Sequence, residues 1–251
     1  MKIILPNAKE LNTNLENQPF VPLSEKSRAV LGALQQLSVT DLAGFYKLKE
    51  DRAELEADRW YRIAHQQAKS YPAWTLYDGL MYRYMKRRDL TDAEQAYLER
   101  HALIATSFYG LISPFTLISP HRLDFQGQLK VEGQSLKQFW RAQYDEELAD
   151  EGLIISLASS EFEQVFSPTI QKRMVQIVFM EDKKGQLKIH STISKKGRGR
   201  LVSLMAAKNV QTLDEIRSLT FDGFAYRADL SEATILVFVR KQGEIEEIKR
   251  K

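Results

Sequence analysis

The chain has 251 residues, of which 43% are hydrophobic and 27% are charged, and its formal net charge is +3. Such a composition is typical of a globular protein with a real core and excludes a disordered chain. The lack of cysteine excludes disulfides, thiolate zinc sites, iron–sulfur clusters and catalytic thiols. Neither an export signal nor a membrane-spanning stretch is visible, so we expect a cytoplasmic protein with no membrane partner.

Helical patterns dominate the first 150 residues. Thr91 with Glu94 and Ser135 with Gln138 have the spacing of capping boxes, which satisfy backbone N–H groups at helix starts. Thr40 is the expected cap of the second helix. The predicted elements in this part are a strand over 2–5 and helices over 24–37, 40–48, 51–69, 91–105 and from 135 to just before 152.

Strand patterns dominate the rest of the chain. The apolar run 153–157 predicts a central strand that is covered on both faces. Further strands are predicted over 174–180, 186–194 and 234–240, with a hairpin turn at 181–185 and helices over 200–208 and after Thr212. The sequence therefore predicts a single α+β domain over 1–251, with a helix-rich N-terminal part, a mixed β-sheet made mainly by the C-terminal part, and the two termini pairing in that sheet.

The small net charge hides an asymmetry. Seven basic residues and no acidic residue fall between Lys183 and Arg200, which leaves the rest of the chain at net −4. A basic segment on an otherwise acidic chain is typical of a protein with a polyanionic partner. The alternative is a solvated hairpin whose lysines only keep an edge strand from aggregating.

The centre of this basic segment predicts an anion site. Lys195, Lys196, Arg198 and Arg200 surround two glycines at the expected junction between a strand and a helix. Glycine permits a positive φ and a close backbone approach, and a helix start favours anions. The spacing matches neither a Walker loop nor a Rossmann loop.

Several segments resemble the YaaA family of peroxide-stress-response proteins, in order along nearly the whole chain. Asn7 and Gly197 depart from the family patterns, which have S-P-A-K in the first segment and K-K-A-R-G in the last. The matching segments are 5–9, Gly79 with Tyr82, 108–111 with Pro114, 120–124, 138–140, 157–162 and 195–199.

The resemblance implies a cytoplasmic protein that limits oxidative damage to DNA under hydrogen peroxide. It also implies non-specific binding of double-stranded or distorted DNA in a basic cleft, a helix-hairpin-helix-like element at about 40–63, and a link to low free iron. Lys9 and Arg122 join the cleft if the strand ends converge there, and Lys188 and His190 extend its basic surface.

The residues of the helix-hairpin-helix-like element favour a scaffold role. Its turn lacks the glycines that expose backbone amides to phosphate, and acidic residues crowd the second helix. These acids repel phosphate within a Debye length of about 8–10 Å. Lys47, Lys49 and Arg52 are therefore only lesser candidates for DNA contacts, as are His121 and Tyr226.

An alternative function is an enzyme that acts on a phosphate-bearing small molecule. In that reading the basic residues of the cleft hold the anion while Glu161 or Asp124 acts as general base. The histidines have no metal-site spacing, and we expect neither a metal nor a cofactor.

Overall fold

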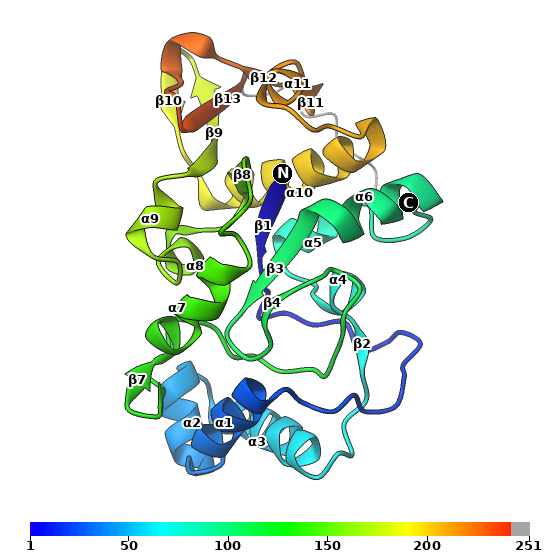
Figure 1. Cartoon of the computed structure of the whole chain (residues 1–251), viewed down its shortest axis with the longest axis vertical. Helices are drawn as coiled ribbons and strands as arrows, with labels where there is room; N and C mark the ends of the chain where they lie inside the picture. The colour runs from blue at the N-terminus through cyan, green and yellow to red at the C-terminus, as the bar shows by residue number, and fades with distance from the viewer. Residues whose placement is uncertain (242–251) are drawn as a thin grey trace.

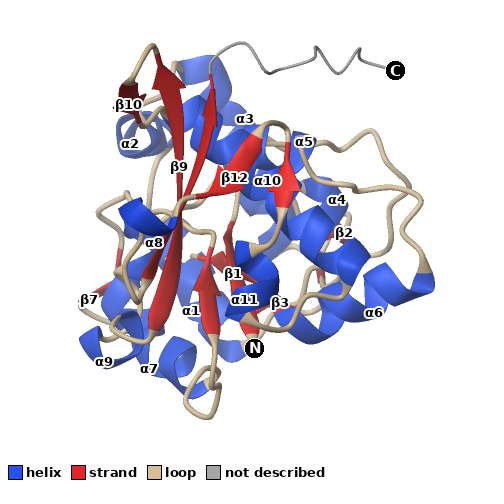
Figure 2. Ribbon diagram, turned by 90° about the horizontal axis from the view of Figure 1, so that it is seen from above, coloured by secondary structure: helices blue, strands red, loops and turns tan. Residues whose placement is uncertain are grey.

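A computed structural model describes residues 1–241 of the chain, and within them a nine-stranded mixed sheet has helices on both faces (Figures 1 and 2). In spatial order the strands are β11 (Thr220–Phe221), β12 (Phe224–Tyr226), β13 (Ile235–Lys241), β9 (Met174–Lys183), β8 (Ile154–Ser156), β1 (Lys2–Pro6), β3 (Ala102–Thr106) and β4 (Gly110–Ile112), and β10 (Gln186–Lys188) pairs with β9. The five strands from β13 to β3 are parallel, and the outer pairings are antiparallel.

The helices connect and cover these strands. They are α1 (Glu25–Leu34), α2 (Val39–Tyr46), α3 (Glu50–Ala64), α4 (Ala73–Leu76), α5 (Leu80–Arg83), α6 (Asp92–His101), α7 (Leu136–Glu146), α8 (Ser160–Glu163), α9 (Pro168–Gln171), α10 (Ser191–Lys208) and α11 (Leu213–Arg217). Two small ribbons pair β2 (Tyr71–Pro72) with β5 (Leu117–Ile118) and β6 (Lys130–Val131) with β7 (Gln134–Ser135). The predicted α+β class with a mixed sheet is confirmed.

The order of the strands reverses at β1 and β8. From β1 the chain reaches β3 on one side, whereas from β8 it reaches β9 on the other side. The loops that leave the carboxyl ends of β1 and β8 therefore separate and leave a crevice between them. In sheets of this kind ligands bind in that crevice.

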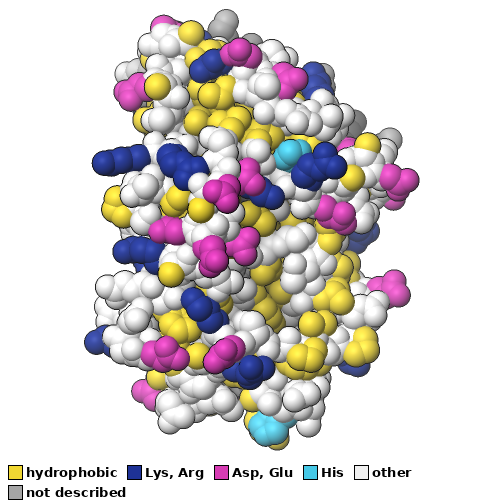
Figure 3. Space-filling view, in the orientation of Figure 1, with side chains coloured by type: hydrophobic (Ala, Val, Ile, Leu, Met, Phe, Trp, Pro, Cys, Tyr) yellow, Lys and Arg dark blue, Asp and Glu magenta, His cyan; other side chains and the backbone are white. Residues whose placement is uncertain are grey.

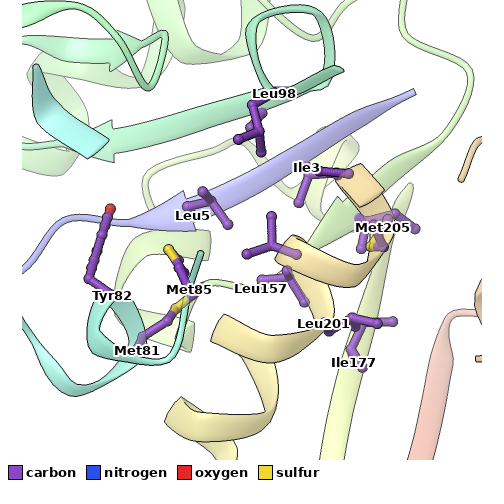
Figure 4. Close-up of a cluster of buried hydrophobic side chains, with 14 of the residues drawn as sticks. Ile3, Leu5, Met81, Tyr82, Met85, Leu98, Leu157, Ile177, Leu201 and Met205 are labelled. Atoms are coloured by element: carbon purple, nitrogen blue, oxygen red, sulfur yellow. The ribbon is translucent and has the colours of Figure 1, made fainter. Parts of the chain in front are cut away.

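Alternating side chains on β1 belong to two hydrophobic cores, one on each face of the sheet. Ile3 and Leu5 pack with α5, α6 and α10, whereas Ile4 packs with α1, α3 and α7. Figure 4 shows the first core, in which Leu201 of α10 lies beside Ile177 of β9. A strand that is apolar on both faces is typical of the middle of a parallel sheet.

Most helix starts agree with the sequence prediction. The capping boxes at Thr91 and Ser135 are confirmed, as is the capping role of Thr212. The second helix is capped by Ser38 rather than Thr40. The Ser38 hydroxyl accepts a hydrogen bond from the backbone N–H of Asp41, and the Asp41 carboxylate accepts one from the backbone N–H of Ser38. The third helix ends at Ala64, earlier than expected.

Two predictions about the sheet are wrong. The first strand, β1, and the last described strand, β13, lie in one sheet but do not pair, because β8 and β9 separate them. The strand expected over 186–194 ends at Lys188, and α10 begins at Ser191. A stripe of buried residues four apart, Ile193, Gly197, Leu201 and Met205, stabilises the helix despite its two glycines.

The predicted basic turn is also wrong, because Lys195 to Arg200 lie inside α10. Gly197 and Gly199 do not have positive φ angles. A Cβ at Gly197 would lie 2.6 Å from the Phe179 ring of β9, and a Cβ at Gly199 would collide with the carbonyl oxygen of Met81. The glycines therefore permit close packing of the helix and do not cradle an anion.

We expect Gly199→Ala to destabilise the protein, because the added methyl group meets backbone rather than a movable side chain. Overpacking of this kind typically lowers the free energy of unfolding by about 1–3 kcal/mol. Urea denaturation measures the change. Gly32→Ala on α1 is the control, since nothing lies within 4 Å of its Cβ and alanine improves helix propensity. An equal effect of both substitutions would contradict the packing role.

Candidate functional site

A cavity of about 400 Å³ lies at the crevice between β1 and β8. Its wall comes from the loops that follow these two strands, from the start of α5 and from α10. The lining residues with polar or charged side chains are Asn7, Lys9, Glu10, Tyr82, Asp124, Gln126, Ser159, Glu161, Lys195 and Arg198. We call this space the switch-point cavity.

Lys9, Asp124, Gln126 and Glu161 form a connected network along one side of the cavity. The Lys9 ammonium lies 2.5 Å from Asp124 Oδ2 and donates to Gln126 Oε1 at 3.2 Å. Gln126 Nε2 in turn donates to Glu161 Oε2 at 2.7 Å, and its backbone N–H donates to Asp124 Oδ1 at 2.9 Å. The two carboxylates proposed as general bases are therefore brought together, and Gln126 holds both.

The two carboxylates differ in environment. Burial raises the pKa of Glu161, the nearby Asp124 charge raises it further, and the contacts to Gln126 and Lys9 oppose both effects. Asp124 instead has the Lys9 ammonium as a direct counter-charge. A carboxyl whose pKa moves toward neutrality in a cavity is a common property of acid–base sites.

The four cations of α10 divide between two faces of the helix. Lys195 and Arg198 line the switch-point cavity. Lys196 and Arg200 lie over the Tyr84 ring at 4.9 and 5.4 Å, and Arg200 also pairs with Asp222 at 3.2 Å. The four cations therefore do not form the expected single cluster. Successive residues are rotated by about 100° around a helix, so two of the cations face the cavity and the other two face away from it.

Two further cavities extend the switch-point cavity into a groove along α3. The second, of about 360 Å³, shares Lys9 and Glu10 with the first, and the third, of about 340 Å³, shares Leu55 and Arg59 with the second. The other charged residues that line this groove are Arg52, Glu56, Asp58, Arg62, Lys69, Asp78, Arg83 and Arg122. On the face drawn in Figure 3 basic and acidic side chains are likewise interspersed.

Five groove cations have no carboxylate within 4 Å among residues 1–241: Arg52, Lys69, Arg122, Lys195 and Arg198. Arg59, Arg62 and Arg83 are paired with Glu56, Asp58 and Glu10 respectively. Burial lowers the pKa of Arg198, and its Nε has no hydrogen-bond partner in the described part of the chain. These five cations are the groups most available to an anion.

The other predicted site residues lie outside the groove lining. Lys188 is exposed on β10 and His190 is exposed just before α10. Lys47 and Lys49 are exposed in the connection between α2 and α3. Tyr226 lies on β12, with the Arg217 guanidinium 5.9 Å from its ring centre. No group of three His, Asp or Glu side chains within residues 1–241 is placed to hold a metal ion.

Sequence reasoning missed Gln126 and the cations of α3 other than Arg52. Arg52, Leu55, Arg59 and Arg62 follow one another at helical spacing, and this signal was sufficient to place them on one face. Gln126 carried no signal, because its role depends on contacts with distant residues.

His121, a lesser candidate, is 1% exposed and packs among the rings of Trp60, Phe108 and Tyr109. Its Nδ1 lies 2.9 Å from the carbonyl oxygen of Ser119, and its Nε2 has no partner among the described residues. Burial lowers the pKa of His121 to about 4. The side chain is therefore a neutral core residue that lines none of the three groove cavities.

We expect the His121 pKa to make the protein acid-sensitive. Below pH 6.5, the ordinary histidine pKa, His121 is protonated in the unfolded chain. In the folded chain it stays neutral until about pH 4. The free energy of unfolding then falls by up to about 3 kcal/mol over this range. Urea titrations between pH 7.5 and 4.5 should show a shallower fall for His121→Asn, whereas the exposed control His190→Asn should follow the wild type. Parallel curves for wild type and His121→Asn would refute this account.

Comparison with known proteins gives extensive matches. A family model described as "Peroxide stress protein YaaA" matches residues 1–230. UPF0246 proteins of Streptococcus pneumoniae strains P1031 and Hungary19A-6 are each 50% identical to this chain over 241 residues, which is 96% of this chain and 100% of the relative. The UPF0246 protein spr1405 of strain ATCC BAA-255 / R6 is 49% identical over the same length.

Proposed function

Because this chain belongs to the peroxide stress protein YaaA family, we propose that it binds DNA non-specifically in the groove between α10 and α3. The observation that supports DNA as the ligand is the set of five unpaired cations, Arg52, Lys69, Arg122, Lys195 and Arg198. They come from both ends and the middle of a groove that is continuous through three cavities. A small anion would need only one such cluster, whereas a nucleic acid backbone presents phosphates along its length.

The type of contact determines the specificity. Arginine and lysine contacts to phosphate position a duplex but carry no sequence information. One phosphate neutralised at each of these five cations contributes a slope of log K against log salt of about −4.5, or roughly a five-hundredfold loss of affinity between 50 and 200 mM salt. The proposed complex is therefore electrostatic and tolerant of sequence.

The bound protein would protect DNA in the cytoplasm by covering it. A bound protein covers the duplex and keeps iron away from the phosphates, which limits Fenton chemistry at the DNA. The helices α2 and α3 contribute through Arg52 and otherwise serve as scaffold. Exposed acids at Glu50, Asp51 and Glu54 lie beside Arg52 and weaken further phosphate contacts.

A matched pair of double variants tests this proposal. Lys195→Ala with Arg198→Ala removes the cavity-facing cations and should make the salt slope shallower by about 1.8. Lys196→Ala with Arg200→Ala removes the same charge from the same helix on the Tyr84 side and should change the slope little. Fluorescence anisotropy with a random duplex between 50 and 200 mM salt measures both slopes. Equal slopes for the two variants would remove the groove from the binding site.

A second candidate function is an enzyme that acts on a phosphate-bearing small molecule in the switch-point cavity. The specific observation that favours it is the raised pKa of Glu161 beside Asp124, in the cavity that Lys195 and Arg198 also line. The two cations would hold the phosphate, and Glu161 would transfer a proton at a pH nearer to neutrality than an ordinary carboxyl.

Glu161→Gln separates this candidate from DNA binding, because it keeps the size of the side chain and removes its proton transfer. Phosphorus NMR of nucleoside 5′-monophosphates with the wild type should reveal turnover, and the variant should lose it while keeping its affinity for duplex DNA. The exposed control Glu99→Gln should behave as wild type. Absence of turnover in the wild type would exclude this candidate for these substrates.

A further inference from the structure

The hairpin of β9 and β10, together with β13, projects beyond β8 and β1. The last residue of β8, Ser156, pairs with Gln176, but β9 continues for seven more residues to Lys183. At about 3.3 Å per residue this extension is roughly 23 Å long, and Figure 2 shows β9 reaching well past β1. The extension leaves the sheet on the same side as the carboxyl ends of β1 and β8, where the switch-point cavity lies.

The hairpin is fixed rather than loose. Lys184 and Gly185 have φ angles of 55° and 85°, the pair of positive values that a two-residue hairpin turn requires. The backbone N–H of Gly185 donates to Asp182 Oδ1 at 2.7 Å. Pairing of β9 with β13 continues as far as Asp182, so that one edge of the extension is already occupied.

Two aliphatic side chains of this hairpin face solvent. Leu187 is 40% exposed and Ile189 is 60% exposed, and they are two residues apart. Of the five large exposed hydrophobic residues within 1–241, no other two lie so close in sequence. Exposed aliphatic side chains on a rigid, projecting element indicate contact with an apolar surface of a partner.

The charge around these two residues indicates what that partner is. Lys183, Lys184 and Lys188 are exposed, and the hairpin adjoins a stretch without any acid up to Arg200. None of the three lysines has a carboxylate within 4 Å in the described part of the chain. A partner with an anionic surface and apolar faces inside it is a nucleic acid, whose stacked bases lie between rows of phosphates.

The hairpin is also attached to the groove. Ile189 and His190 lead directly into α10, and Lys195 lies four residues, or about 6 Å of helix rise, beyond Ser191. A duplex held by Lys195 and Arg198 therefore passes the base of the hairpin.

We infer that the hairpin is a wedge: its lysines contact phosphates, and Leu187 and Ile189 enter the duplex held in the groove and unstack a base step. This inference rests on the proposed function. DNA-bending proteins use aliphatic side chains in this way from the minor groove. The protein would therefore favour DNA that is already kinked or partly unpaired, because unstacking costs less there.

A duplex that carries 2-aminopurine at one internal position tests the wedge, because the fluorescence of this base rises when it is unstacked. The wild type should raise the fluorescence on binding, and Leu187→Ala with Ile189→Ala should abolish the rise without changing the salt slope. Removing Lys183, Lys184 and Lys188 should make the slope shallower by up to about 2.7 and leave the rise in the saturated complex. Val21→Ala is the control, since Val21 is 39% exposed and distant in sequence.

The outcomes separate the wedge from the proposed function. A wild type that binds the duplex without a fluorescence rise, or a rise that persists in the double variant, overturns the wedge and leaves DNA binding intact. A wild type that binds no duplex at 50 mM salt overturns both. If the double variant keeps the duplex signal but loses binding to phosphatidylglycerol vesicles, the hairpin is a membrane contact and the inference is wrong.

Discussion

Helix α10 packs very closely against a strand and against another helix. Such close packing requires glycine at the points of contact, because a side chain there would collide with the neighbouring element. Gly197 meets the ring of Phe179 on β9, and Gly199 meets the backbone of α5 at Met81. These two contacts determine both the depth and the rotation of α10 on the sheet. The rotation in turn directs Lys195 and Arg198 toward the crevice between β1 and β8 and turns Lys196 and Arg200 toward Tyr84. The position of the candidate site therefore depends on close packing, a requirement of the core.

The electrostatics of the groove depends on which cations are paired. Arg59, Arg62 and Arg83 have carboxylate partners on nearby residues, whereas Arg198 is half-buried without one. The exposed ion pairs of Arg62 and Arg83 contribute little to stability and are screened by salt. A partly buried, unpaired guanidinium instead favours any anion that replaces the water it has lost. Acidic residues elsewhere in the groove repel an anionic ligand and therefore restrict where it could lie.

Local signals explain why much of the fold could be predicted. A capping box such as Thr91 with Glu94 is complete within four residues, and β8 is a short apolar run, so both appear in the sequence without reference to distant contacts. Ser38 and Thr40 are both good caps, and the choice between them depended on Asp41. The basic segment was misassigned because its glycines suggest a turn, although Ile193, Gly197, Leu201 and Met205 have the spacing of a buried helical face.

By itself the sequence determined the α+β class, most element starts, the family, and the presence of a concentrated basic segment, because these properties depend on residues near one another in the chain. Only the tertiary structure decided which cations face the groove, that Gln126 joins Asp124 to Glu161, and that the β9–β10 hairpin projects past β8 and β1. These features arise where segments 30 to more than 100 residues apart meet. No local pattern encodes such meetings, since they follow from how the whole sheet assembles and how closely α10 packs against it.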